Sequence, residues 1–82
     1  MMQIYYFSTS TCGPCKMFKP VVQEVQRELG VHINYIDATL NPALTEQYNI
    51  SAVPTIIVER NGKVTGKWTG VMSKSQLSQF LS

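Results

Sequence analysis

Apolar residues in the first third of the chain follow two patterns, one typical of strands and one typical of helices. A β-branched and aromatic run at residues 3–7 predicts a buried strand. Farther on, apolar residues stand at relative positions 0, 3, 4, 7 and 11, which places them on one helix face: Phe18, Val21, Val22, Val25 and Leu29. Gly30 stands where this helix should end. Pro20, inside the helix, predicts a kink because its nitrogen has no proton to donate.

The middle of the chain predicts shorter elements. Residues 31–37 have the apolar content of a second strand. Asn41 and Pro42 are typical N-cap and first-turn residues, so a short helix is expected from there to about Tyr48. After a connector, residues 55–59 form an apolar run that predicts a third strand.

The last part of the chain predicts a hairpin and a helix. Asn61-Gly62 is a strong signal for a tight β-hairpin turn, so residues 64–69 should pair back on the third strand. Ser73 and Gln76 have the spacing of a capping box at a helix start. The apolar stripe of that helix consists of Leu77, Phe80 and Leu81.

The predicted element order is β-α-β-α-β-β-α, with no internal repeat or linker, so we expect one domain over residues 1–82. Two strands joined by a long helix imply a right-handed parallel crossover, and the final hairpin adds antiparallel strands. The expected fold is α/β, a four-stranded mixed sheet flanked by three helices.

Composition narrows the function classes. A chain of 82 residues with 44% hydrophobic and 15% charged residues has the profile of one small globule, and it is too short for a catalytic barrel. A net charge of +2, spread along the chain, does not favour nucleic acid. No apolar run is long enough for a membrane span, and the start lacks the basic region of a secretory signal. We therefore expect a cytoplasmic protein, in which a cysteine pair is typically catalytic or metal-binding.

The two cysteines, Cys12 and Cys15, stand where the first strand has ended and the long helix begins. Unpaired amide protons and the helix dipole favour a negative sulfur at a helix N-terminus, and the thiolate is the reactive form. Cys12 should be exposed at the tip and Cys15 held in the first turn. The sequence thus predicts Cys12 as the nucleophile on a substrate disulfide and Cys15 as the resolving cysteine, which releases the reduced product.

Two other uses of the pair are weaker. A zinc site needs about four ligands, whereas the chain offers two cysteines and His32, which is on the next predicted strand. A purely structural disulfide that closes two intervening residues would constrain little of the unfolded chain. Motif, position and compartment together favour redox exchange.

The run Cys12-Gly13-Pro14-Cys15-Lys16 resembles the active site of thioredoxins. The resemblance covers nearly the whole chain, because further features of that family have counterparts here: Pro20, residues 37–42, residues 48–55 with Val53-Pro54-Thr55, Asn61-Gly62, and Gly70.

This resemblance implies that the Val53-Pro54 peptide bond is cis, whereas the sequence by itself also allows an ordinary trans proline at a strand start. In the family, the backbone before this proline pairs with an extended substrate segment, which is strand addition. By analogy, a shallow substrate groove around Cys12 is expected, formed by Thr11, Gly13, Pro14, Val53, Pro54, Gly70 and Val71.

The chain departs from the family pattern in three ways. It starts at the strand before the active site, without the opening strand and helix of longer thioredoxins, so the second strand should be a sheet edge. Thr11 stands where thioredoxins usually have tryptophan. Tyr6 and Tyr35 stand where the family has a buried acid and its lysine partner, and tyrosine is a poor base at neutral pH. We expect these two tyrosines to be core aromatics that touch across adjacent strands.

The resemblance implies a protein-disulfide reductase without a bound cofactor, which acts on disulfide-containing client proteins and is regenerated by a thioredoxin reductase or another thiol system. A monomer that binds neither nucleic acid nor membrane is expected. One alternative is a glutathione-coupled, glutaredoxin-like reductase, which the short fold and Thr11 favour and Gly13-Pro14 disfavours. Another is a binding subunit of a larger complex, in which the fold and not the thiol is needed.

Overall fold

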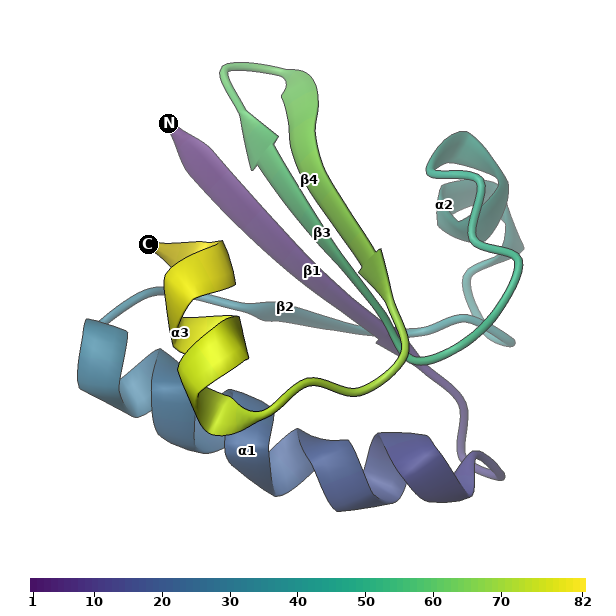
Figure 1. Cartoon of the computed structure of the whole chain (residues 1–82). Helices are drawn as coiled ribbons and strands as arrows, with labels where there is room; N and C mark the ends of the chain where they lie inside the picture. The colour runs from purple at the N-terminus through teal and green to yellow at the C-terminus, as the bar shows by residue number, and fades with distance from the viewer.

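The structure is a computed structural model that describes residues 1–82. It contains four strands and three helices in the predicted order (Figure 1): β1 (Met2–Ser8), α1 (Gly13–Leu29), β2 (Asn34–Asp37), α2 (Pro42–Gln47), β3 (Thr55–Arg60), β4 (Lys63–Thr69) and α3 (Lys74–Leu81). The α/β fold class expected from the sequence is therefore confirmed. No helix in the structure is both long enough and apolar enough to cross a membrane.

The strands form one mixed sheet in the order β2-β1-β3-β4. β1 and β2 are parallel, and the other neighbours are antiparallel. β2 is an edge strand, as predicted, but it has only four residues and starts at Asn34, three residues later than expected. The Asn34 side-chain amide donates to the Ile4 carbonyl oxygen at 3.1 Å, so a side chain meets β1 where a further backbone pair was predicted.

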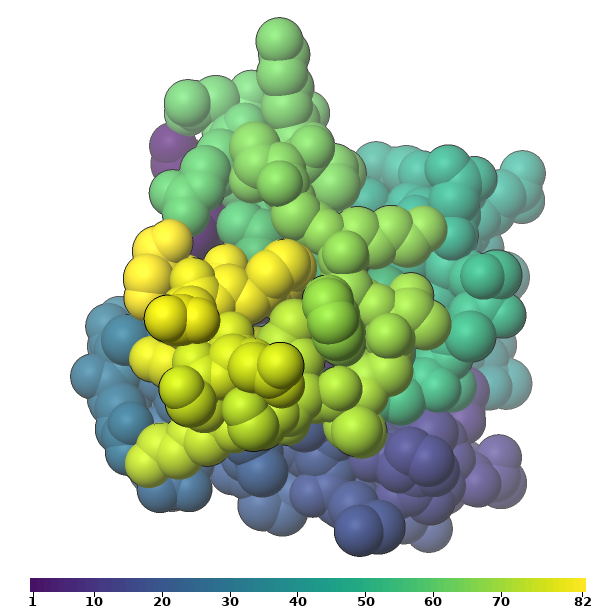
Figure 2. Space-filling model, viewed as in Figure 1, coloured from purple at the N-terminus to yellow at the C-terminus, as the bar shows by residue number.

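Two hydrophobic clusters lie on opposite faces of the sheet, because successive strand side chains alternate in direction. On the face covered by α1 and α3 (Figure 1), the main cluster includes Ile4 and Tyr6 of β1. On the other face, Phe7 packs with Tyr48, which directly follows α2. Figure 2 shows α3, in yellow, pressed against both α1 and β4. β1 is therefore covered on both faces of the sheet.

Polar contacts border the hydrophobic cluster beside α2. The Tyr48 hydroxyl donates to a Glu59 carboxylate oxygen at 3.0 Å, and the Lys67 ammonium donates to the Asn49 carbonyl oxygen at 2.8 Å. Burial raises the pKa of Tyr48 above its usual value of 10.0. Asn41 occupies the N-cap position of α2, as predicted, but its side-chain amide donates to the Asp37 carbonyl oxygen and makes no cap hydrogen bond.

Turn and cap signals in the sequence match the structure. Asn61 and Gly62 form the β3–β4 turn with φ of 51° and 81°, the left-handed conformation that such hairpins need. Ser73 and Gln76 form the predicted capping box at the start of α3. Gly30, which has φ of 67°, caps the C-terminal end of α1, and the helix is continuous through Pro20.

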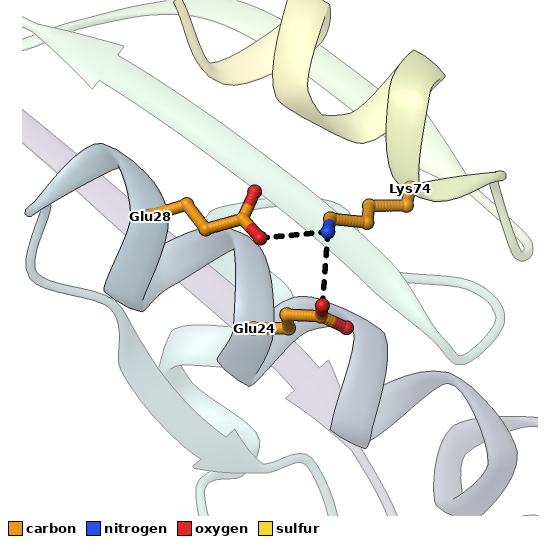
Figure 3. A network of polar contacts seen from close by, with 3 residues as sticks. All are labelled: Glu24, Glu28 and Lys74. Atoms are coloured by element: carbon orange, nitrogen blue, oxygen red, sulfur yellow. Dashed lines mark hydrogen bonds and ion pairs between the residues drawn. The ribbon is translucent and has the colours of Figure 1, made fainter.

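A three-residue ion-pair network joins α1 and α3, the two helices that cover the same face of the sheet (Figure 3). The Lys74 ammonium lies 2.6 Å from Glu28 and 2.9 Å from Glu24, both on α1. The hydrogen bond from Lys74 lowers the pKa of Glu24, and the hydrogen bonds to Glu28 and Glu24 raise the pKa of Lys74. Because all three side chains are about half exposed, the network is expected to contribute little to the stability of the fold.

Candidate active site at the start of the long helix

The candidate site begins where β1 gives way to α1. The Cys12 amide donates to the Thr9 carbonyl oxygen at 3.3 Å, which closes a tight turn after the strand. Cys12 then adopts an extended backbone and occupies the N-cap position of α1. Its Sγ accepts the backbone N–H of Cys15 at 3.1 Å, so sulfur does here what a serine or aspartate oxygen usually does.

Cys12 and Cys15 form a disulfide, with their Cα atoms 5.2 Å apart. Cys12 is partly exposed, whereas Cys15 is 3% exposed. The structure thus reproduces the asymmetry expected from the sequence, with one sulfur at the tip and the other in the first helical turn. An amide proton already aimed at Cys12 Sγ is well placed to stabilise negative charge on that sulfur once the disulfide opens.

The loop before β3 lies beside the disulfide. The Val53-Pro54 peptide bond is cis, and the Val53 carbonyl oxygen lies 3.9 Å from Cys12 Sγ. The Gly70 amide donates to the Pro54 carbonyl oxygen at 2.8 Å, which brings the end of β4 to the same place. Gly70 has φ of 106°, a conformation that favours glycine.

The residues predicted to form a substrate groove differ in exposure. Thr11, Gly13 and Pro14 are exposed around Cys12, and Val71 is 55% exposed after Gly70. Pro54, in contrast, is buried. The backbone contacts bring Val53, Pro54 and Gly70 to Cys12. Substrate binding by these residues stays a prediction.

Tyr6 and Tyr35 are directly paired across β1 and β2, with ring centroids 5.8 Å apart. Tyr6 is fully buried, and its hydroxyl donates to the Cys15 carbonyl oxygen at 2.8 Å. Burial, followed by the nearby Tyr35, raises the pKa of Tyr6 to about 12. The expectation of two core aromatics is therefore right for Tyr6 and wrong for Tyr35, which is 36% exposed and donates to Gln26.

A cavity of about 400 Å³ opens beside the disulfide, on the side of β2. Cys15 is part of its wall, together with residues from the end of β1 and the turn after it, the first two turns of α1 and the end of β2: Ser8, Thr9, Ser10, Lys16, Lys19, Tyr35, Ile36 and Asp37. The sequence pattern did not predict this cavity. The signals for it were the spacing of Lys16 and Lys19 on one helix and the parallel strand ends that bring Ser8 beside Asp37.

Other candidate residues lie outside this site. The structure contains no group of three or more potential metal-ligating side chains. His32, the possible metal ligand considered above, interacts with Asn34 at 3.1 Å. Trp68 is 41% exposed and lines a shallow groove against α3 with Met72, Gln76, Gln79 and Phe80.

Comparisons with known proteins agree with the geometry. The sequence profile of the Thioredoxin family matches residues 2–82. A thioredoxin from Chlamydia trachomatis is 36% identical over 77 residues, which cover 93% of this chain and 76% of that protein. A thioredoxin from Haemophilus influenzae is 32% identical over 73 residues, with 87% and 68% covered.

Solved structures give the same result for the fold. A mutant thioredoxin from Halobacterium salinarum superposes with a TM-score of 0.88 at 27% identity, over 95% of this chain and 69% of that one. A thioredoxin-2 described as a component of malaria parasite protein secretion machinery superposes with a TM-score of 0.91 at 20% identity, over 99% and 81%.

Proposed function

Because this chain belongs to the thioredoxin family, we propose that it reduces protein disulfides, with Cys12 as the attacking and Cys15 as the resolving cysteine. Its family and its Cys12–Cys15 disulfide make it a thiol-disulfide oxidoreductase. The direction of electron flow and the two cysteine roles are the parts that we propose. The observation that carries the two cysteine roles is the difference in exposure between Cys12 and Cys15 at one helix N-terminus. The direction of electron flow rests on the likeness of Cys12-Gly13-Pro14-Cys15 to the active site of thioredoxins.

In the first step, the reduced protein attacks a client disulfide. The Cys12 thiolate, stabilised by the Cys15 amide, displaces one client sulfur and forms a mixed disulfide with the other. The displaced client sulfur leaves as a thiolate and takes up a proton. One S–S bond breaks and one forms, so no electron carrier outside the two partners is needed.

In the second step, Cys15 releases the client. After losing its proton, Cys15 attacks Cys12 Sγ, breaks the mixed disulfide and forms the intramolecular disulfide seen in the structure. The second client sulfur leaves as a thiolate and is protonated. The client has gained two electrons and two protons, and this chain has lost them.

Client binding is proposed to use strand addition beside the cis-proline loop. The Val53 carbonyl oxygen points toward Cys12 and can pair with an extended client segment, and the exposed Thr11, Pro14 and Val71 provide the rim. Regeneration requires a second thiol system, either a thioredoxin reductase or a low-mass thiol, in a reducing compartment such as the cytoplasm.

Two single variants test the cysteine roles. Cys15→Ser should accumulate a mixed disulfide with a client such as insulin, because attack proceeds and resolution fails, whereas Cys12→Ser should form none. Non-reducing electrophoresis and mass spectrometry measure the adduct. Equal trapping by both variants, or trapping only by Cys12→Ser, contradicts the proposed order.

Recycling distinguishes the reductase from the other functions. Turnover of insulin with NADPH and a thioredoxin reductase supports the proposal, whereas turnover only with glutathione and its reductase supports the glutaredoxin-like alternative. If a Cys12→Ser/Cys15→Ser variant retained the full biological function of the chain, the binding-subunit alternative would hold instead.

A further inference from the structure

We propose that the cavity beside the disulfide is a carboxylate subsite, in which Lys16 and Lys19 favour disulfide substrates that carry an acidic group near the reacting sulfur. This inference rests on the proposed reductase function and specifies its substrate class. It starts from the position of the cavity, which shares Cys15 with the redox site.

The cavity and the cis-proline loop lie on opposite sides of the disulfide. β1 leads into Cys12, and its two neighbours in the sheet are β2 on one side and β3 on the other. The cavity reaches the β2 side through Tyr35 and Asp37, whereas Val53, just before β3, contacts Cys12 from the other side. A substrate that pairs beside Val53 can therefore extend a flanking group over the cavity.

The walls of the cavity carry unneutralised positive charge. Lys16 and Lys19 are three residues apart on α1 and therefore project from the same side of the helix. Neither takes part in an ion pair, because the ion pairs of this structure are those of Lys74 with Glu24 and Glu28. The Lys19 ammonium lies 5.5 Å from the centre of the Tyr35 ring, an attraction that holds it over the β2 side of the cavity.

A single carboxylate opposes these two ammonium groups. Asp37 is in the cavity wall, and its Oδ1 already accepts the backbone N–H groups of Thr39 at 2.9 Å and Leu40 at 3.3 Å. Two cations against one engaged carboxylate leave an excess of positive charge. The hydroxyls of Ser8, Thr9 and Ser10 add hydrogen-bond donors, so the cavity offers what a carboxylate ligand needs.

The test compares matched disulfides that differ only in charge. One pair consists of two peptide disulfides with either glutamate or glutamine beside the cysteine, and the other of dithiodipropionate and its uncharged diamide. The reduced protein is mixed with each, and the second-order rate constant of thiol release is measured. The readout is the acid-to-amide ratio of rate constants, because any effect on the general reactivity of Cys12 cancels in the ratio.

The variant Lys16→Gln/Lys19→Gln removes both cations from the cavity. Its matched control is Arg60→Gln/Lys63→Gln, which removes the same charge at the hairpin, from the last residue of β3 and the first residue of β4. We expect the cavity variant to lower the acid-to-amide ratio by about 1.4- to 5-fold, the range for exposed ion pairs. The control should keep the wild-type ratio. Asp37→Asn should raise the ratio, since it removes the opposing carboxylate.

Salt provides an independent check, because exposed charges are screened over about 10 Å at 0.1 M. The difference between wild type and the cavity variant should shrink as salt is added. A ratio that falls equally in both double variants, or in neither, overturns the subsite. If the acidic substrate is preferred in both pairs, the subsite also accepts low-mass disulfides. If the preference is confined to the peptides, the subsite recognises acidic side chains of client proteins. Failure to reduce even the uncharged disulfides would instead refute the reductase function.

Discussion

The hydroxyl of Tyr6 donates a hydrogen bond to the backbone carbonyl oxygen of Cys15, 2.8 Å away in the core. This bond ties β1 to the first turn of α1 at the residue proposed to resolve the mixed disulfide. The Tyr6 ring also packs edge-on against Phe18 of α1, with centroids 6.0 Å apart. Tyr6 stands where the resemblance to thioredoxins would place a buried acid. In this chain the residue instead anchors β1 to α1.

Tyr6→Phe should lower the free energy of unfolding by about 1 kcal/mol, the typical net contribution of one hydrogen bond. Because the variant keeps the ring and its contacts, the decrease in stability reports the contribution of the hydroxyl group alone. Equilibrium unfolding in urea measures it. Tyr35→Phe is the matched control, because it removes a hydroxyl whose bond to Gln26 is exposed. An equal or larger loss in the control would contradict the anchoring role of Tyr6.

Alkaline titration should reveal the same buried hydroxyl. The pKa of Tyr6 is raised to about 12 from 10.0, so folding favours its protonated form. That contribution is fully present below about pH 10 and is lost as the pH rises toward about 12. The free energy of unfolding of the wild type should therefore fall more steeply over this window than that of Tyr6→Phe. Parallel curves for the two proteins would refute the assignment.

Gly70→Ala should destabilise the loop beside the disulfide by about 1–3 kcal/mol, because φ of 106° is strained for any residue with a Cβ. Thermal or urea unfolding measures the loss. Gly13→Ala is the control, since no heavy atom lies within 4 Å of its added Cβ and its φ is outside the left-handed region. If both variants unfold alike, the conformation of Gly70 is not what constrains the loop.

The ion-pair network between α1 and α3 should respond to acid. Because the pKa of Glu24 is lowered from 4.5, its contribution to stability is present above that pH and is lost as the pH falls through the lower value in the folded protein. Lys74→Gln should flatten this part of the stability curve, and high salt should do the same to the wild type. A salt-independent acid transition identical in both proteins would show that the network does not contribute.

Most of the fold was predictable from local sequence signals. The spacing from Phe18 to Leu29 predicted α1, and Asn61-Gly62 predicted the hairpin, because each signal acts within a few residues. The start of β2 was not predictable, since it depends on a contact from Asn34 to Ile4 across the sheet. For the same reason, the apolar and aromatic pattern could not show that Tyr35 lies at the surface.

The disulfide and the cysteine asymmetry were predictable because motif and helix start coincide. The cavity was not, because its walls come from three segments that only the tertiary fold brings together. The positive charge of the cavity depends on the absence of an acidic partner for its lysines, which the sequence pattern does not show. Lys16 and Lys19 become informative only once the structure shows that no acidic side chain pairs with them.

The shortness of β2 also has a consequence for how the molecule behaves in a concentrated solution. Only four residues of this edge strand have the extended geometry that another chain could use as a template. A turn anchored by the Asp37 carboxylate follows at once, at Thr39 and Leu40. So brief an edge offers few backbone partners in register, and it thereby limits the addition of a further strand on the β2 side of the sheet.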